Sequence, residues 1–179
     1  MAYAGTGDGP YRRTFGPRLD PHVVLYWTGP EVVSLGINRE ALDLSVHRFY
    51  DHEHLLWDNY PVNDFAPETL YLGPLRGRHP RLAQGRLRGI IANGMVQAVP
   101  SKLALATVAD WARDPFAYDA IASYERALAE HGAEVVEALR GLDSSRVTVE
   151  PPADVPGLDD ALALGVDAAT GVALLEPFV

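Results

Sequence analysis

Three short apolar runs stand out along the chain. They cover residues 22–27, 54–57 and 88–94, and each is followed by turn-forming residues. Continuous apolar runs of this length are typical of strands that are buried on both faces of a parallel sheet. We therefore expect three buried parallel strands at these positions.

Elsewhere, apolar residues recur at the spacing of a helix, which indicates amphipathic helices. The expected helices span 39–49, 101–111 and 115–131, and they start at Asn38, Ser101 and Pro115. Asparagine and serine cap helix N-termini through their side-chain oxygens, and proline suits the first helical position.

The order of these elements limits the fold. Strand, helix, strand, long loop, strand and helices form a run of β/α units, which belong to a doubly wound sheet or to a (β/α)8 barrel. A whole barrel takes about 250 residues, and only three strands are clear. We therefore expect an α/β fold in which residues 1–140 form the C-terminal portion of a (β/α)8 barrel and 141–179 form a short tail of uncertain structure.

The connection over residues 58–80 is unusually long. Loops of this length are either functional or disordered. The side chains of Phe65, Leu70 and Tyr71 favour an ordered loop, because they can be buried against the rest of the fold.

Composition removes several classes of function. The chain has 179 residues, a net charge of −9 and no cysteine. The negative charge argues against binding to nucleic acid or to an anionic membrane, and the lack of cysteine excludes disulfides and thiolate chemistry. There is no apolar stretch long enough to span a bilayer and no signal-peptide pattern. We expect a cytoplasmic location, with a larger exported parent protein as the alternative, and neither a cofactor nor a metal.

Residues 55–64 carry the densest candidate chemistry. The carboxyl end of a strand in an α/β fold is where ligands bind. An indole offers a surface for stacking, and amides and carboxylates bind hydroxyl groups, so the segment points to carbohydrate. The indole is that of Trp57, the amides are those of Asn59 and Asn63, and the carboxylates are those of Asp58 and Asp64.

These residues also have plain structural explanations. Trp57 could fill the mouth of a barrel, and Asp64 could be a turn residue or a helix N-cap. Asp58 has the opposite strand parity from Asn59, so we expect it to point away from the pocket and to be structural.

Two further clusters are explained without a ligand. A group of potential metal ligands lies at a helix end and before the amino end of a strand, where a solvated turn is the favoured interpretation; it consists of His47, Asp51, His52, Glu53 and His54. The glycine-rich residues 5–9 lack the Lys-Ser/Thr that completes a phosphate-binding loop.

Five blocks of sequence, taken in order, carry a resemblance to a known family. They cover residues 3–7, 26–34 (Tyr-Trp-Thr-Gly-Pro-Glu-Val-Val-Ser), 57–64 (Trp-Asp-Asn-Tyr-Pro-Val-Asn-Asp), 70–74 and 89–95, and helices over 101–119 follow. Over residues 1 to about 130 the chain resembles the C-terminal part of the catalytic barrel of glycoside hydrolase family 84. These β-N-acetylglucosaminidases include O-GlcNAcases and bacterial hyaluronidase-type enzymes. The resemblance places the chain from about the fifth or sixth barrel strand to the eighth.

The resemblance implies a retaining mechanism that the substrate assists. The 2-acetamido oxygen attacks the anomeric carbon and gives an oxazoline, an exception to the usual scheme of two protein carboxylates. An adjacent pair of aspartates assists, and the family carries it upstream of the five blocks, so the resemblance implies that this chain lacks it. The adjacent pair Asp159 and Asp160 is better explained as the first turn of a helix in the tail.

The resemblance also implies roles for seven residues, six of which bind substrate. Tyr3 would line the acetamide end as an auxiliary to catalysis, Thr28 and Val32 would border the acetamide pocket, and Trp57 would pack on the acetamide methyl and the sugar face. Asn59 would face the anomeric side, Asp64 would bind the 4- and 6-hydroxyls, and Asn93 would bind another hydroxyl.

Two functions from different classes follow. In the first, the chain carries the sugar-binding half of a β-N-acetylglucosaminidase that acts on a glycan, glycoprotein or glycosaminoglycan. Its partner would be the missing N-terminal half-barrel or a second copy. In the second, the chain is a non-catalytic N-acetylglucosamine-binding remnant or the product of a truncated gene.

Overall fold

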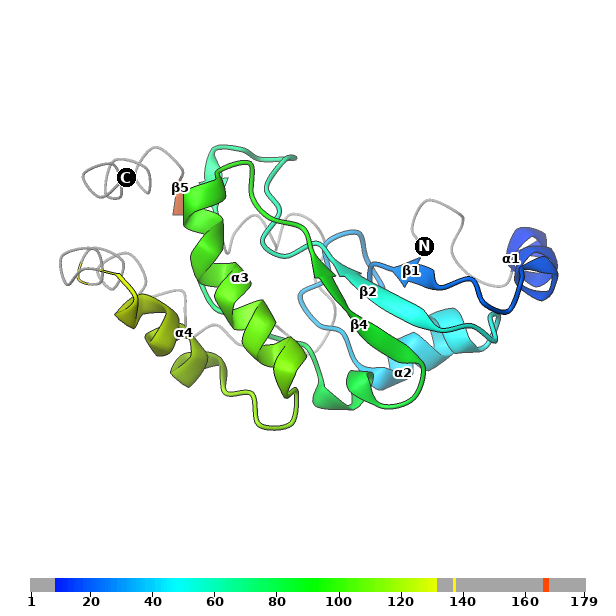
Figure 1. Cartoon of the computed structure of the whole chain (residues 1–179). Coiled ribbons are helices and arrows are strands. Elements are labelled where there is room, and N and C mark those ends of the chain that lie inside the picture. The colour runs from blue at the N-terminus through cyan, green and yellow to red at the C-terminus, as the bar shows by residue number, and fades with distance from the viewer. Residues whose placement is uncertain (1–8, 132–136, 138–165, 168–179) are drawn as a thin grey trace.

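The computed structural model describes residues 9–131, 137 and 166–167 (Figure 1). In chain order its elements are α1 (Pro10–Phe15), η2 (Gly16–Arg18), β1 (Leu25–Trp27), α2 (Arg39–Leu42), η3 (Asp43–His47), β2 (His54–Asp58), β3 (Thr69–Leu70), η4 (Pro80–Ala83), β4 (Leu87–Ala92), α3 (Ala98–Arg113), α4 (Ala120–Ala129) and β5 (Val166–Asp167). The order matches the predicted run of β/α units.

The three predicted strands form one parallel sheet in the order β1-β2-β4. Leu25 pairs with His54, and Trp57 pairs with Ile91. The first strand starts later than predicted, because Val23 still belongs to a turn in which its amide donates to the carbonyl of Asp20 (3.0 Å).

Only one face of this sheet is covered in the described part of the chain. Trp27 and Leu56 are buried on the covered face, whereas Tyr26, Trp57 and Ile91 are exposed on the opposite face. The prediction of burial on both faces is therefore wrong here. The alternation follows from the period of a strand, in which successive side chains point to opposite faces.

The helices supply the cover. A helical stretch made of α2 and η3 follows β1, and α3 follows β4 and lies alongside it, with α4 beyond (Figure 1). One apolar core joins the sheet to these helices and contains Trp27, Leu42, Leu56, Leu75 and Trp111. A second core joins α3 to α4 and to residues 70–72.

Helix starts depart from prediction in two of three cases. Asn38 caps α2 as predicted, with its Oδ1 accepting from the amide of Ala41 (2.8 Å). The prediction for Ser101 is wrong, since α3 begins at Ala98 and the Ser101 hydroxyl donates back to the carbonyl of Gln97 (2.8 Å). The prediction for Pro115 is also wrong, because Asp119 provides the cap of α4.

The long connection after β2 is ordered, as predicted. The Tyr60 hydroxyl donates to the carbonyl of Gly73 (2.5 Å), and the Tyr118 hydroxyl donates to the carbonyl of Leu75 (2.7 Å). Within the connection, β3 pairs antiparallel with β5 from the tail. In the described ranges, no helix is long and apolar enough to cross a membrane.

Candidate functional site

The carboxyl ends of the three parallel strands meet at one edge of the sheet. Thr28 directly follows β1 and Asn59 directly follows β2. Asn93 directly follows β4, and its amide donates to the carbonyl of Asp58 (2.9 Å). Parallel pairing thus brings together polar residues that are far apart in the sequence.

Asn59 is the centre of this edge. Its Oδ1 accepts from the indole Nε1 of Trp57 (3.0 Å) and from Nδ2 of Asn93 (3.2 Å). Its Nδ2 donates to the carbonyl of Val32 (2.6 Å), which lies in the loop after β1. One side chain therefore connects segments that follow all three strands, and we refer to Val32, Trp57, Asn59 and Asn93 as the Asn59 cluster.

The chemistry of Trp57 fixes the orientation of the Asn59 amide. An indole nitrogen can only donate a hydrogen bond, so the side-chain oxygen of Asn59 must face it. The nitrogen of Asn59 then points to the Val32 carbonyl, which can only accept. No other orientation of this amide satisfies both partners.

Trp57 presents its ring on the exposed face of the sheet, opposite the covered one. We call this the bare face. It is 40% exposed, whereas Trp27 and Trp111 are 1% and 3% exposed. The ring of Tyr26 meets it edge-on, with centroids 5.8 Å apart. An exposed indole whose N–H is already bound is held in place, and its apolar face remains available for contact with a ligand.

Asp64 lies beyond β2 in a turn that its buried neighbour fixes. Asn63 donates to the carbonyl of Thr69 (2.7 Å) and to Oε1 of Gln97 (2.8 Å), and it accepts from the amide of Val96 (2.8 Å). The Asp64 carboxylate itself is exposed. The hydrogen bonds of Asn63 thus fix the backbone of the turn, and the side chain of Asp64 extends from that turn into solvent.

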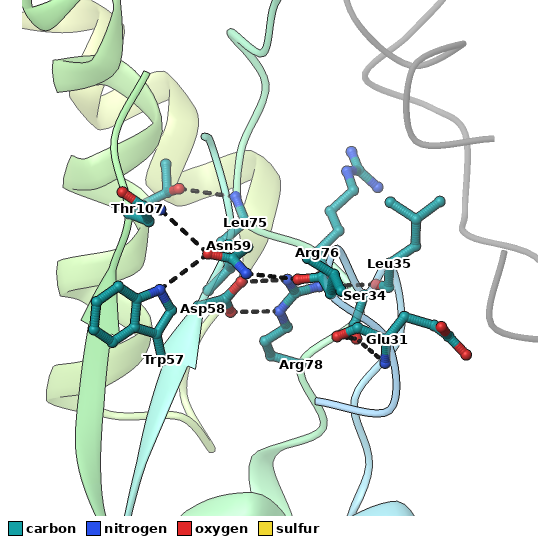
Figure 2. A network of polar contacts seen from close by, with 12 residues as sticks. Glu31, Ser34, Leu35, Trp57, Asp58, Asn59, Leu75, Arg76, Arg78 and Thr107 are labelled. Atoms are coloured by element: carbon teal, nitrogen blue, oxygen red, sulfur yellow. Dashed lines mark hydrogen bonds and ion pairs between the residues drawn. The ribbon is translucent and has the colours of Figure 1, made fainter. Parts of the chain in front are cut away.

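Behind the Asn59 cluster lies a buried ion pair. The guanidinium of Arg78 donates from Nε to Oδ2 of Asp58 (2.7 Å) and from Nη2 to Oδ1 (2.6 Å). Figure 2 shows Asp58 between Arg78 on one side and Trp57 on the other. Asp58 was predicted to be structural, and its burial in this ion pair agrees with that role. The role of Arg78 was not predicted; an aspartate at a buried strand end, which needs a cation nearby, was the available signal.

Of the seven predicted site residues, the structure brings four into contact and leaves two outside these contacts, and the seventh is not among the described residues. The four are those of the Asn59 cluster. Thr28 follows β1 at the same edge and Asp64 is in its exposed turn, but neither makes these contacts. Tyr3, Asp159 and Asp160 lie outside the described residues, as do residues 5–8 of the glycine-rich segment.

Two histidines at or just before the start of β2 are not in a solvated turn. His52 and His54 are buried, so this prediction is wrong for them, whereas Asp51 is exposed as expected. His54 is the first residue of β2 and points to the covered face of the sheet, which explains its burial.

The chemistry available at this edge is that of a binding surface. It offers an indole face, two amides and a nearby carboxylate, which suit the hydroxyl groups and apolar faces of a sugar. Within the described ranges there is no group of three or more metal-ligating side chains, and no two aspartates are adjacent in the sequence.

Comparison with known proteins places the chain among glycoside hydrolases. Residues 1–143 match the family model described as beta-N-acetylglucosaminidase. Protein O-GlcNAcase from Rattus norvegicus and that from Mus musculus are each 35% identical to this chain over 111 residues, which is 62% of it.

Solved structures agree. A variant of the O-GlcNAc hydrolase of Thermobaculum terrenum superposes with a TM-score of 0.72 at 32% identity over 82% of this chain, and CpGH84B with 0.69 at 29% identity over 75%. The chain spans 12% of the length of the two O-GlcNAcases, and 32% and 24% of the two solved chains.

Proposed function

Because this chain belongs to the β-N-acetylglucosaminidase family, we propose that it carries the sugar-binding part of a site that hydrolyses β-linked N-acetylglucosaminides. The observation that supports this most is the Asn59 cluster, which gathers an exposed indole and two amides at the carboxyl ends of the three strands. Ligands of α/β folds bind at that end of the sheet.

In the proposed site, the sugar lies on the exposed face of Trp57. Stacking on the ring removes apolar area of both partners from water. Asn59 faces the anomeric side and Asn93 binds a hydroxyl group. Asp64 binds the 4- and 6-hydroxyls, because hydrogen bonds to a carboxylate are charge-assisted and stronger than neutral ones.

The proposed reaction is retaining and assisted by the substrate. The 2-acetamido oxygen attacks the anomeric carbon, the bond to the leaving group breaks, and an oxazoline forms that water then opens. Thr28 and Val32 border the acetamide pocket, and Tyr3 assists at its far end. An aspartate pair would polarise the acetamide and protonate the leaving group, and the described residues of this chain hold no such pair.

The proposed partner of the chain is the remainder of a (β/α)8 barrel. The bare face of the sheet carries Tyr26, Trp57 and Ile91, and β1 and β4 each have an edge that is unpaired among the described strands. Parallel sheets are normally covered on both faces, and open edges pair with other chains. An N-terminal half-barrel, or failing that a second copy of this chain, would cover this surface.

A non-catalytic role as an N-acetylglucosamine-binding remnant is the second candidate. It is favoured by one observation, the absence of adjacent aspartates in the described part of the chain. Turnover separates the two functions, because a remnant would bind sugar but gain no activity from any partner half.

Two assays on the purified chain test the proposal. We expect no hydrolysis of an aryl N-acetylglucosaminide by the chain alone, and hydrolysis when the N-terminal half of a homologous barrel is added. Calorimetric titration with N-acetylglucosamine should show binding in the millimolar range that Asp64→Ala weakens at least about tenfold, the loss of one charge-assisted bond. No heat of binding to the wild-type chain would overturn the proposal.

A further inference from the structure

We propose that Arg78 is a positioning residue for sugar recognition. It holds the loop over residues 29–36 against the end of β2 and so fixes Asn59 and Trp57. The inference rests on the proposed function, because it concerns the same sugar site, and it adds a residue that does not touch the sugar. It follows from the contacts of the Arg78 guanidinium on two sides.

On one side, Arg78 is joined to β2. Its Nε and Nη2 bind both carboxylate oxygens of Asp58, at 2.7 and 2.6 Å, in the bidentate geometry that suits a guanidinium. The side chains of Arg78 and Asp58 are only 4% and 1% exposed. The pair lies directly beneath the candidate site, because Asp58 is the last residue of β2 and is flanked in the sequence by Trp57 and Asn59.

On the other side, Arg78 is joined to the loop after β1. Its Nη1 donates to the carbonyl of Leu35 (2.8 Å) and to that of Arg76 (2.9 Å). Residues 37 and 78 also form a parallel bridge, in which the Ile37 amide donates to the carbonyl of Gly77 (2.8 Å). Figure 2 shows Leu35 and Arg76 on the side of Arg78 that faces away from Trp57.

The 29–36 loop is tightly bonded within itself. The Ser34 hydroxyl accepts from the amide of Glu31 (3.0 Å) and donates to its carbonyl (3.1 Å). Gly29 has a φ of +100°, and a Cβ there would approach the Ser34 hydroxyl to 2.5 Å, so only glycine fits. A change in the position of Leu35 is therefore passed on to the rest of the loop, including Val32.

The same loop supplies the partner of the Asn59 amide. The Val32 carbonyl accepts from Nδ2 of Asn59 at 2.6 Å, while Oδ1 of Asn59 receives the indole N–H of Trp57 at 3.0 Å. Displacement of the loop would remove the acceptor of Nδ2 and free the amide to rotate. Trp57 would then lose the bond that fixes its ring. Arg78 thus controls two sugar contacts through one loop.

A purely stabilising role does not explain this arrangement. Replacing a buried ion pair by apolar residues of similar size is often neutral or stabilising, so stability alone does not require charges here. An apolar pair cannot, however, supply the third bond, from Arg78 to the Leu35 carbonyl. That bond distinguishes positioning from packing, and the experiment exploits the difference.

The test compares stability with sugar binding in an apolar double variant. Asp58→Leu combined with Arg78→Met should keep a denaturation midpoint close to that of the wild-type chain. We expect its dissociation constant for N-acetylglucosamine, measured by calorimetry, to rise at least about tenfold. In NMR spectra of a ¹⁵N-labelled sample without sugar, the indole N–H signal of Trp57 should also shift. The reason is that its acceptor, the Asn59 amide, is no longer held by the Val32 carbonyl.

Two further variants complete the design. Arg78→Lys keeps the cation but not the bidentate geometry, and we expect it to fold and to raise the dissociation constant by several-fold. Arg126→Met is the matched control, since it breaks an exposed ion pair with Asp110 (2.8 Å) on the far helices and should leave the dissociation constant unchanged.

The outcomes separate the two proposals. If the wild-type chain binds the sugar and the folded double variant binds it equally well, the positioning role is overturned and the proposed function stands. If the double variant does not fold, the Arg78→Lys variant decides. A dissociation constant for the sugar equal to that of the wild-type chain overturns the positioning role and leaves the proposed function standing. If the wild-type chain binds no sugar, the proposed function fails and this inference fails with it.

Discussion

Among single residues, Asn59 has the most constrained chemistry at the candidate site. Its oxygen receives two hydrogen bonds, from Trp57 and Asn93, and its nitrogen gives one to Val32. The indole of Trp57, which can only donate, and the carbonyl of Val32, which can only accept, each allow only one orientation of the amide. The oxygen and nitrogen of the Asn59 amide therefore cannot exchange positions without loss of these hydrogen bonds.

This asymmetry gives a prediction for Asn59→Asp. The variant places a second oxygen where Nδ2 now meets the Val32 carbonyl at 2.6 Å, so a donor is lost and two acceptors face each other. We expect a loss of about 1–3 kcal/mol in the free energy of unfolding, the cost of an unsatisfied buried polar group, measured by urea denaturation. Asn38→Asp is the matched control, because at a helix N-cap only the oxygen is used and both residues cap well. An equal loss in both variants would contradict the account.

Sequence reasoning reached some of these residues and missed others for identifiable reasons. The alternation of a strand predicts a structural role for Asp58, and its burial in the ion pair agrees with that role. It cannot find Arg78, which comes from a distant loop and whose position depends on the folded path of the chain. His54 was misjudged because neighbouring polar residues suggested a surface turn, whereas the strand that begins there directs its ring inward.

At the scale of elements, α3 holds the long connection in place through Thr107. Its hydroxyl accepts from the amide of Leu75 (2.8 Å) and donates to the carbonyl of Ala104 (2.7 Å), and the residue is completely buried. Thr107→Val keeps the shape but leaves the Leu75 amide without an acceptor. We expect a loss of about 1–3 kcal/mol in unfolding free energy. Thr107→Ser retains the hydroxyl and should lose clearly less; the reverse order in urea denaturation would be incompatible with this role.

The start of β2 makes stability depend on pH. Burial, together with the nearby charges of His47 and His52, lowers the pKa of His54 to about 4. The unfolded chain takes up this proton near pH 6.5, so between pH 6.5 and 4 the unfolded state binds more protons and stability falls as pH falls. The loss approaches about 3 kcal/mol at pH 4.

Unfolding free energies measured across this pH range check the prediction. His54→Leu should flatten the dependence between pH 6.5 and 4. His22→Asn, which changes an exposed histidine, should leave it unchanged. A His54→Leu variant with the full wild-type slope would show that another group is responsible.

Helix boundaries were the weakest sequence predictions at this scale. Ser101 looks like a cap, yet Pro100 is tolerated in the first turn of a helix, and the helix begins before both. Pro115 lies in a turn that Asp114 stabilises by accepting from the amides of Phe116 and Ala117, both at 3.1 Å. For α4 a local side-chain bond that the periodicity of apolar residues does not reveal, from the Ala122 amide to Asp119, caps the start of the helix, whereas α3 starts at Ala98 without a side-chain cap.

For the molecule as a whole, the bare face of the sheet is the dominant feature. Tyr26, Trp57 and Ile91 are each at least a third exposed there, beside unpaired strand edges. The sequence predicted three parallel strands and their order in the chain. It could not predict which face lacks a cover, because apolar runs look the same whether the covering residues belong to this chain or to another.

Such a surface should promote association. We expect the isolated chain to self-associate in sedimentation experiments as its concentration rises, and Ile91→Lys to shift it toward monomer without loss of folding, because the side chain is on the bare face. Phe116→Lys changes an equally apolar exposed residue away from the sheet and should have little effect. A wild-type chain that is monomeric at every concentration would count against an uncovered sheet.

The central claim is that this chain binds N-acetylglucosamine through the edge that Trp57 and Asn59 form. Trp57 is the only tryptophan of the three with an exposed ring, since Trp27 and Trp111 are buried. Tryptophan fluorescence titrated with N-acetylglucosamine is therefore the most direct measurement. The account predicts a saturable change that Trp57→Phe abolishes; no change at millimolar sugar, or the same change in Trp57→Phe, would contradict it.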